Sequence, residues 1–157
     1  MLLHTGIPKL DDALEGGLKK GSSLLVSAIP GIKGLEFCQQ ILNAQLKNGR
    51  RAAYFVNDKK PSAVREMLRS YDWDAESYEK QGKLVFVDAY SGILSQQSAE
   101  KFVVKNPFDI KDICAKVKQS TTVIGNHLVL IFDNISTLFD ECGTGSEGLS
   151  CIKDGLV

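Results

Sequence analysis

Four short runs of mostly apolar residues are spaced along the chain, and each ends in a polar or glycine-containing turn. They are Ser23–Ile29, Arg51–Val56, Leu84–Asp88 and Leu128–Asp133. Within each run the apolar residues follow one another instead of alternating with polar ones, which is typical of strands covered on both faces. The runs therefore predict four buried strands.

The segments between these runs have apolar residues at helical spacing. This spacing predicts helices over Gly34–Asn48 with Gly49 as the stop, over Ala63–Ser70 after Pro61, over Ala75–Gln81, and from Asp109 to about Gln119. Residues 89–107 have no clear period and are predicted to form a long loop, with a partly helical segment as the alternative. Strands that alternate with helices predict an α/β fold of three layers around a mainly parallel sheet, in which ligands bind beyond the carboxyl ends of the strands.

Composition narrows the class of protein. The chain has 157 residues, of which 43% are hydrophobic and 24% charged, and this balance predicts one globular domain. Its formal net charge of zero disfavours nucleic acid and membrane surfaces as partners. The sequence shows no signal-peptide pattern and no apolar run of membrane-spanning length, so we expect a cytoplasmic protein. Its cysteines and histidines lack the spacing of a metal site.

The end of the first predicted strand is a candidate phosphate-binding loop. The turn between this strand and the next helix comprises Pro30, Gly31, Ile32, Lys33, Gly34 and Leu35. Such loops need glycines so that backbone N–H groups can wrap a phosphate, a lysine for the β and γ oxygens, and a hydroxyl for Mg²⁺. Gly31 and Lys33 fit these requirements, but Leu35 has no hydroxyl. An ordinary turn between a strand and a helix is an equally good interpretation.

Polar residues also follow two later predicted strands. Asn57 and Asp58 come directly after Val56, and a carboxylate there can position an attacking water. Asp133 ends the fourth run, where an acidic residue can hold a Mg²⁺-bound water. The alternatives are a capped helix start at Asp58 and a helix cap at Asp133. The three candidates are more informative together than separately, because all of them follow strands of one sheet.

Together these motifs resemble the KaiC-like branch of the RecA superfamily of P-loop ATPases. Residues 5–22, TGIPKLDDALEGGLKKGS, are similar to the opening segment of that family, TGIPGLDELLGGGIPKGS. Residues 27–37 fall on its Walker A stretch, SGGPGTGKTTF, and Asn57-Asp58 fall on its paired glutamates. Residues 82–91 resemble its GKLxxxDAYS segment. Residues 128–136, LVLIFDNIS, resemble its Walker B strand, with Asp133 at the Mg²⁺ position.

The resemblance implies a three-layer RecA-like P-loop NTPase fold that binds ATP and Mg²⁺, often between neighbouring subunits of a ring. It assigns residues 30–35 to cofactor binding, Asn57 and Asp58 to catalysis, and Asp133 to the metal. Domains of this family are considerably longer. We therefore expect residues 1–157 to form a single RecA/KaiC-like domain that is incomplete at its C-terminus and lacks the late strands of the sheet.

The Walker A stretch departs from the family pattern. Aligned on Pro30-Gly31, the glycine, lysine and threonine of the family fall on Lys33, Gly34 and Leu35, so a glycine replaces the catalytic lysine and the hydroxyl is lost. Glu36 adds a negative charge where the helix N-terminus should attract phosphate. Losing several parts that act as a unit is expected to remove most of the rate of phosphoryl transfer.

These departures favour one of three hypotheses. The favoured one is a degenerate KaiC-like nucleotide-binding protein with weak or no ATP hydrolysis, acting as a regulatory or partner subunit in a homo-oligomer or beside related subunits. The alternative is an active ATPase that uses Lys33 and Asp58 in a shifted geometry. A nucleic-acid-binding recombinase relative is a third hypothesis, which the balanced charge disfavours.

Overall fold

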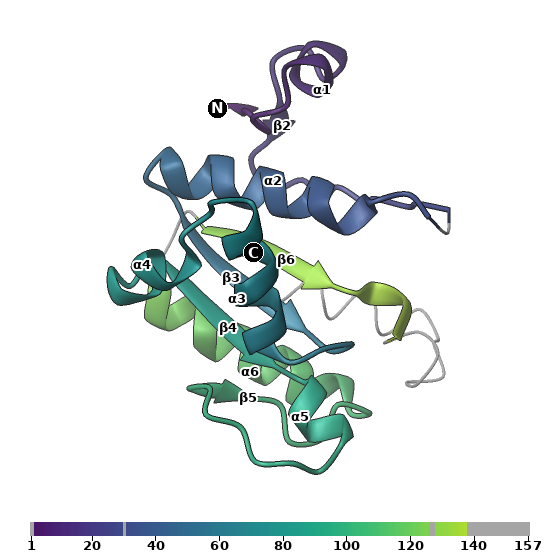
Figure 1. Cartoon of the computed structure of the whole chain (residues 1–157), viewed down its shortest axis with the longest axis vertical. Helices are drawn as coiled ribbons and strands as arrows, with labels where there is room; N and C mark the ends of the chain where they lie inside the picture. The colour runs from purple at the N-terminus through teal and green to yellow at the C-terminus, as the bar shows by residue number, and fades with distance from the viewer. Residues whose placement is uncertain (1, 30, 126–127, 138–157) are drawn as a thin grey trace.

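A computed structural model describes residues 2–29, 31–125 and 128–137 of the chain (Figure 1). Its strands are β1 (Leu2–Leu3), β2 (Leu18–Lys19), β3 (Arg51–Val56), β4 (Leu84–Asp88), β5 (Phe102–Val103) and β6 (Leu128–Asp133). Its helices are α1 (Pro8–Ala13), α2 (Gly34–Lys47), α3 (Pro61–Ser70), α4 (Ala75–Lys80), α5 (Tyr90–Ile93) and α6 (Ile110–Ile124). No described helix is long and apolar enough to cross a membrane.

The main sheet has four strands in the order β5-β4-β3-β6, and all its pairings are parallel. Strand β3 lies at the centre, where Tyr54 pairs with Phe86 of β4 and with Ile131 of β6. This arrangement confirms the α/β class, the parallel sheet and three of the four strands expected from the sequence.

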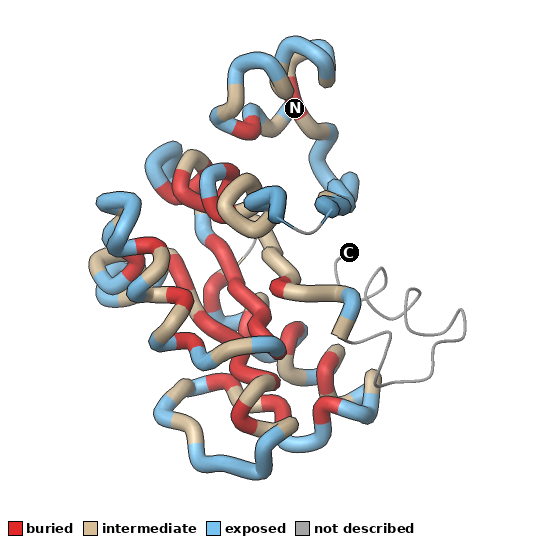
Figure 2. The backbone as a smooth tube through the Cα atoms, turned by 45° about the vertical axis from the view of Figure 1, so that its right-hand side comes forward, coloured by how far each residue is buried: buried red, intermediate tan, exposed pale blue. Residues whose placement is uncertain are grey.

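Helices cover both faces of the sheet and make three layers. Helices α2, α3 and α4 lie on one face, where Tyr54 and Phe86 enter a cluster with Leu42 and Val64. Helix α6 lies on the opposite face, where its residues Ile113 and Val117 join Phe55 in a second cluster. Figure 2 shows the buried residues concentrated on the strands and on the helix surfaces that face them. Burial on both faces explains why the strands are apolar at successive positions.

Two parts of the chain differ in detail from the predicted elements. Helix α6 continues to Ile124 and ends at Gly125, whose φ is +94°, so the predicted end near Gln119 is too early. The buried face of the helix continues after Gln119 with Ser120 and Ile124, although polar residues surround these two in the sequence. Residues 89–107, expected as a loop, contain the short elements α5 and β5.

The predicted first strand, Ser23–Ile29, is wrong: residues 22–29 have no regular secondary structure and are almost all exposed. The side chains of Leu25 and Ile29 are 74% and 73% exposed. An apolar run becomes a strand only where a neighbouring strand pairs with it and a face is buried. No described strand pairs with residues 22–29 or with the outer edge of β6.

The N-terminal hairpin is attached to α2 through a close backbone contact. Residues 2–19 form the β1–β2 pair and α1, which lie beyond α2 in Figure 1. Gly6 has a φ of +78°, and a Cβ at this position would lie 2.3 Å from the Cβ of Ala44. Asp11 Oδ1 accepts a hydrogen bond of 2.6 Å from the backbone N–H of Thr5. The side chain of Asp11 therefore closes the turn that begins at Thr5. The absence of a side chain at Gly6 lets this turn pack closely against α2.

Arg65 of α3 connects three segments on the face of the sheet that α2, α3 and α4 cover. Its guanidinium group makes paired hydrogen bonds with Glu79 of α4, at 2.8 and 2.6 Å, and with Glu100, at 2.7 and 2.9 Å. It also lies 4.4 Å from the ring centroid of Phe86. All three charged side chains are less than a quarter exposed. The hydrogen bonds raise the pKa of Arg65, so the group stays charged.

Replacing Arg65 by methionine is expected to lower the free energy of unfolding by about 2 kcal/mol, because two partly buried carboxylates lose their cation. Arg69, also in α3, pairs with Glu76 of α4, but these side chains are 65% and 48% exposed. The matched variant Arg69→Met should therefore change stability by less than about 0.5 kcal/mol. Chemical denaturation measures both values, and equal losses in the two variants would contradict the prediction.

Candidate functional site

The carboxyl ends of β3 and β6 lie side by side and deliver polar residues to one edge of the sheet. Val56 pairs with Asp133 in the last register position of these strands. Asn57, which is 1% exposed, donates its backbone N–H to the Asp133 carbonyl at 3.0 Å. The Asn57 side chain donates to the Asn134 carbonyl at 2.9 Å and accepts from the Asn134 N–H at 2.7 Å. The two strand ends are thus held together by three hydrogen bonds.

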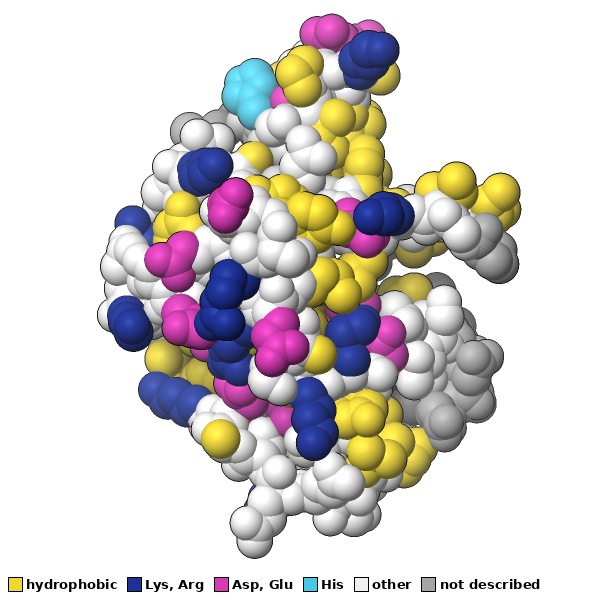
Figure 3. Space-filling model, viewed as in Figure 1, with side chains coloured by type: hydrophobic (Ala, Val, Ile, Leu, Met, Phe, Trp, Pro, Cys, Tyr) yellow, Lys and Arg dark blue, Asp and Glu magenta, His cyan; other side chains and the backbone are white. Residues whose placement is uncertain are grey.

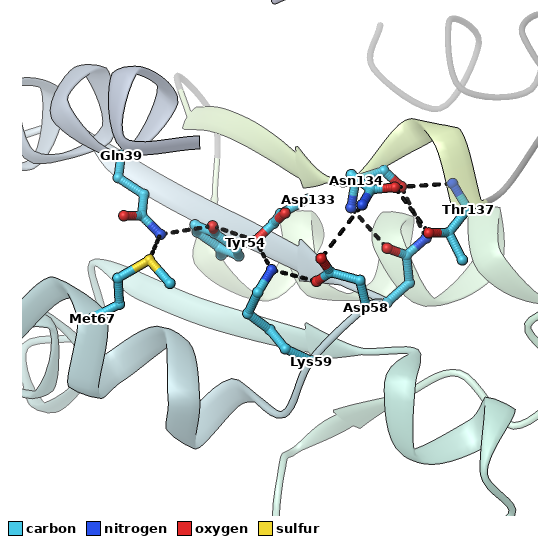
Figure 4. Close-up of polar contacts among 9 residues, drawn as sticks. Gln39, Tyr54, Asp58, Lys59, Met67, Asp133, Asn134 and Thr137 are labelled. Carbon is cyan, nitrogen blue, oxygen red and sulfur yellow. Dashed lines mark hydrogen bonds and ion pairs between the residues drawn. The ribbon is translucent and has the colours of Figure 1, made fainter. Parts of the chain in front are cut away.

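A buried carboxylate lies at the centre of this edge (Figure 4). Asp133 is 4% exposed, and its Oδ2 accepts a hydrogen bond of 2.9 Å from the Tyr54 hydroxyl. The same oxygen lies 3.2 Å from Nζ of Lys59. Nζ of Lys59 also forms an ion pair with Asp58, so the lysine bridges the two carboxylates. The site therefore contains its own cation.

Burial changes the proton affinity of the groups in this cluster. It raises the pKa of Asp133, although the charge of Lys59 opposes the shift. Burial also works against the charge of Lys59, but the hydrogen bond to Asp58 and the charge of Asp133 prevail and raise the pKa of the lysine. The pKa of Tyr54 is raised well above its usual range by burial and by the nearby Asp133. The tyrosine is thus a neutral hydrogen-bond donor.

The first turns of α2 close the cluster from the side. Gln39 Nε2 donates to the Tyr54 hydroxyl at 3.3 Å and lies 3.4 Å from Sδ of Met67. Its other amide atom, Oε1, is buried without a hydrogen-bond partner within the described part of the chain. Burial and the charge of Asp133 raise the pKa of the Cys38 thiol, one residue earlier in α2. A relay of polar contacts therefore runs from α2 through Tyr54 to Asp133.

The sequence predicted Asp133, at one end of this relay, but not Tyr54 and Gln39, which form the rest of it. Asp133, Asp58 and Asn57 were predicted, and the structure brings all three to one edge of the sheet. Tyr54 and Gln39 were not singled out, because a tyrosine inside a strand and a glutamine inside a helix look like ordinary members of those elements. Lys59 was not among the predicted site residues either, yet only 23% of its side chain is exposed. A signal was present, since Lys59 follows directly on Asp58.

The predicted phosphate-binding loop occupies the turn before α2. Pro30 lies outside the described residues. Gly31 adopts a φ of +90°, and Ile32 is 64% exposed. The Lys33 side chain is 75% exposed, with Nζ 4.0 Å from the carboxylate of Glu36. Gly34 and Leu35 lie in the first turn of α2. Neither residue has a side chain that could provide a cation or a hydroxyl.

Backbone contacts within this turn engage some of its N–H groups. The N–H of Gly34 donates to the Ile32 carbonyl at 2.9 Å, and the N–H of Ile32 donates to the Ile29 carbonyl at 3.1 Å. A Cβ at Gly34 would lie 2.7 Å from the Cβ of Ala28. The glycine at the position of the family lysine is therefore also the residue that lets Ala28 lie against α2.

The side chains of this edge do not fit a magnesium ion. Magnesium requires an octahedral shell of oxygen ligands, commonly one or two carboxylates together with phosphate and water oxygens. Asp133 Oδ2 already accepts from Tyr54 and Lys59, and Leu35 stands where the family has a hydroxyl. Among the residues with a defined position, no group of three or more His, Cys, Asp or Glu side chains could hold a metal ion.

The fold and the placement of the candidate residues define a class. A parallel sheet, a glycine-containing turn before α2 and an acidic residue at the end of β6 are features that P-loop ATPases share, although residues 22–29 before the turn form no strand here. The family model described as "ATPase: KaiC" matches residues 3–146. The chain therefore belongs to the KaiC ATPase family of the RecA superfamily, whose members generally bind ATP and Mg²⁺ and commonly oligomerise.

Individual relatives agree with this assignment. The UPF0273 protein MJ1359 of Methanocaldococcus jannaschii is 33% identical over 139 residues, which is 87% of this chain and 57% of the relative. The UPF0273 protein MK0039 of Methanopyrus kandleri is 31% identical over 138 residues, again 87% of this chain and 54% of the relative. The chain thus spans about half the length of the curated relatives that it matches.

Solved structures support the fold alone, because their sequence identities are low. The crystal structure of the KaiC-like protein PH0186 from Pyrococcus horikoshii superposes with a TM-score of 0.76 at 20% identity and covers 100% of this chain and 69% of that one. The uncharacterized protein PH0321 from the same organism, solved in complex with an unknown peptide, gives a TM-score of 0.77 at 16% identity. It covers 98% of this chain and 66% of that one.

Proposed function

We propose that this protein is a degenerate KaiC-like nucleotide-binding subunit with weak or no ATP hydrolysis. The observation that carries the proposal is the turn before α2, where Gly34 and Leu35 stand in place of the family lysine and threonine. Without a lysine at that position, no fixed cation neutralises the charge that develops on the transferred phosphoryl group. We expect nucleotide binding to outlast hydrolysis, because binding needs fewer of these groups.

The acidic end of β3 supports the same conclusion. Asn57 is buried, and both its amide nitrogen and its amide oxygen are hydrogen-bonded to the backbone of Asn134. Asp58 remains as the one carboxylate of the family pair, but Lys59 and, at 3.4 Å, Asn134 donate to it. Both donors would have to move away before the Asp58 carboxylate could contact an attacking water. Activation of a water molecule at this position is therefore expected to be slow.

Residual phosphate binding would rest on Lys33 and the start of α2. Lys33 lies directly before a helix of 14 residues, and its ammonium group is exposed to solvent. The positive end of the helix and a mobile cation both attract phosphate. The same exposure is the observation that favours the alternative function, an active ATPase in which Lys33 reaches the phosphates from one residue earlier.

Calorimetric titration of ATP and hydrolysis assays separate these functions. We expect binding in the millimolar range or tighter, about tenfold weaker in Lys33→Glu and unchanged in the exposed control Lys20→Glu. Phosphate release should stay at the level of a protein-free control. Turnover above that level which Lys33→Ala and Asp58→Asn both abolish would establish the active ATPase instead. No heat of binding at millimolar ATP would overturn the nucleotide-binding part of the proposal.

A role as a partner or regulatory subunit is supported by exposed apolar side chains. Leu24, Leu25, Ile29 and Ile32 are each at least 40% exposed, and Figure 3 shows hydrophobic side chains along this projecting segment. Contiguous apolar side chains at a protein surface mark interaction sites. Light scattering on the eluted protein, alone and with a full-length family member, tests whether the chain joins homo-oligomers or mixed assemblies.

A further inference from the structure

We propose that the ammonium group of Lys59 is the resident cation of this site and occupies the place on Asp133 that a divalent metal ion would otherwise take. Nζ of Lys59 lies 3.2 Å from Asp133 Oδ2 and also contacts Asp58. Within the described residues, Asp58 and Asp133 are the two carboxylates that follow or end β3 and β6, and the ammonium group that links them supplies the positive charge that a bound metal ion would supply.

The position of Lys59 is set by the backbone on both sides. Asn57 is hydrogen-bonded to the end of β6, and Pro61 begins α3. Lys60, the residue before the proline, has extended backbone angles of −68° and 144°. Since a proline restricts the residue before it to such angles, the connection between β3 and α3 has little freedom. The short connection directs Lys59 toward Asp133 and leaves Lys60 exposed.

Lys59 and a metal ion would compete because both are cations that would bind the same oxygen of Asp133. Two carboxylates, Asp58 and Asp133, share one ammonium group, and Tyr54 donates a neutral hydrogen bond to the same oxygen that Lys59 contacts. A divalent ion on that oxygen would have to displace the lysine or lie against a like charge within a few ångströms. The site therefore excludes divalent metals, and any nucleotide it holds is bound without them.

Manganese binding without nucleotide tests this inference separately from the proposed function. The probe is free Mn²⁺, followed by the loss of its electron paramagnetic resonance signal. Wild-type protein should leave the signal unchanged at millimolar Mn²⁺, whereas Lys59→Met should bind the ion at least about tenfold more tightly, because a neighbouring unit charge is removed. Lys60→Met is the matched control and should behave like wild type. The double variant Lys59→Met/Asp133→Asn should lose the gained binding.

Two results would overturn the inference: stoichiometric Mn²⁺ binding by the wild type that Asp133→Asn removes, or no gain of binding in Lys59→Met. If Lys59→Met does not fold, thermal melting of the wild type decides. A melting temperature that Mg²⁺ leaves unchanged supports the inference, and a rise that Asp133→Asn abolishes contradicts it. Failure of ATP to bind would overturn the proposed function and would leave these manganese results unaffected.

Discussion

Replacing Asn57 by alanine is expected to lower the free energy of unfolding by about 2 kcal/mol, because two partly buried backbone groups of Asn134 lose their hydrogen-bond partner. The lost bonds are those of 2.9 and 2.7 Å between the Asn57 amide and the backbone of Asn134. Asn57 is 1% exposed, so water cannot easily replace them. Chemical denaturation followed by circular dichroism measures the effect.

Two variants show whether this loss comes from the hydrogen bonds. Asn57→Asp keeps an acceptor for the Asn134 N–H and restores the carboxylate of the family, so we expect a smaller loss than for alanine. Asn106→Ala changes an exposed asparagine and should alter stability by less than about 0.5 kcal/mol. A loss in Asn57→Ala no larger than that of Asn106→Ala would show that Asn57 is free for another role.

Replacing Asp133 by leucine is expected to lower the free energy of unfolding by about 2–3 kcal/mol. The buried Tyr54 hydroxyl loses the oxygen to which it donates at 2.9 Å, and Lys59 loses one of its two carboxylates. Removal of a buried charge offsets part of this cost, since burial raises the pKa of Asp133 and so disfavours its ionised form.

The isosteric variant Asp133→Asn separates the hydrogen bond from the charge. An amide oxygen still accepts from Tyr54, and Lys59 keeps its ion pair with Asp58. We therefore expect Asp133→Asn to cost less than about 1 kcal/mol, which is a clear difference from leucine. Urea denaturation of both variants in parallel gives the comparison. Equal losses would mean that the ion pair with Lys59, rather than the bond from Tyr54, stabilises the end of β6.

The sequence was sufficient to predict most of the sheet. Strands β3, β4 and β6 were predicted with the bounds that the structure gives them, because burial on both faces leaves a continuous apolar run. The same rule failed for Ser23–Ile29, which has an equally apolar run. An apolar run shows that a segment can be buried. It does not show whether a neighbouring strand is available to pair with that segment.

The candidate site was predicted less completely, for a different reason. Acidic residues at strand ends can be recognised because parallel strands bring their carboxyl ends together, and Asp58 and Asp133 do meet at one edge. Tyr54 has no such positional signature, and the place of Lys59 directly after Asp58 does not show which way its side chain points. Pro61 limits the angles of Lys60, but whether the Lys59 side chain faces solvent or Asp133 also depends on β6, whose Asp133 lies 74 positions away in the sequence.

The order of the strands has a consequence for synthesis on the ribosome. Tyr54 and Asp133 are 79 positions apart, and β6 is the last strand of the described chain to be made. The ribosome releases β3 and β4 together with α3 and α4 long before the partner for the other edge of β3 exists. Until β6 emerges, β3 has an unpaired edge, Tyr54 lacks the acceptor Asp133, and Lys59 has only Asp58 as a partner among the two carboxylates. The nascent chain is therefore most vulnerable to mispairing in this interval, and the cluster around Asp133 is a marker of completed folding.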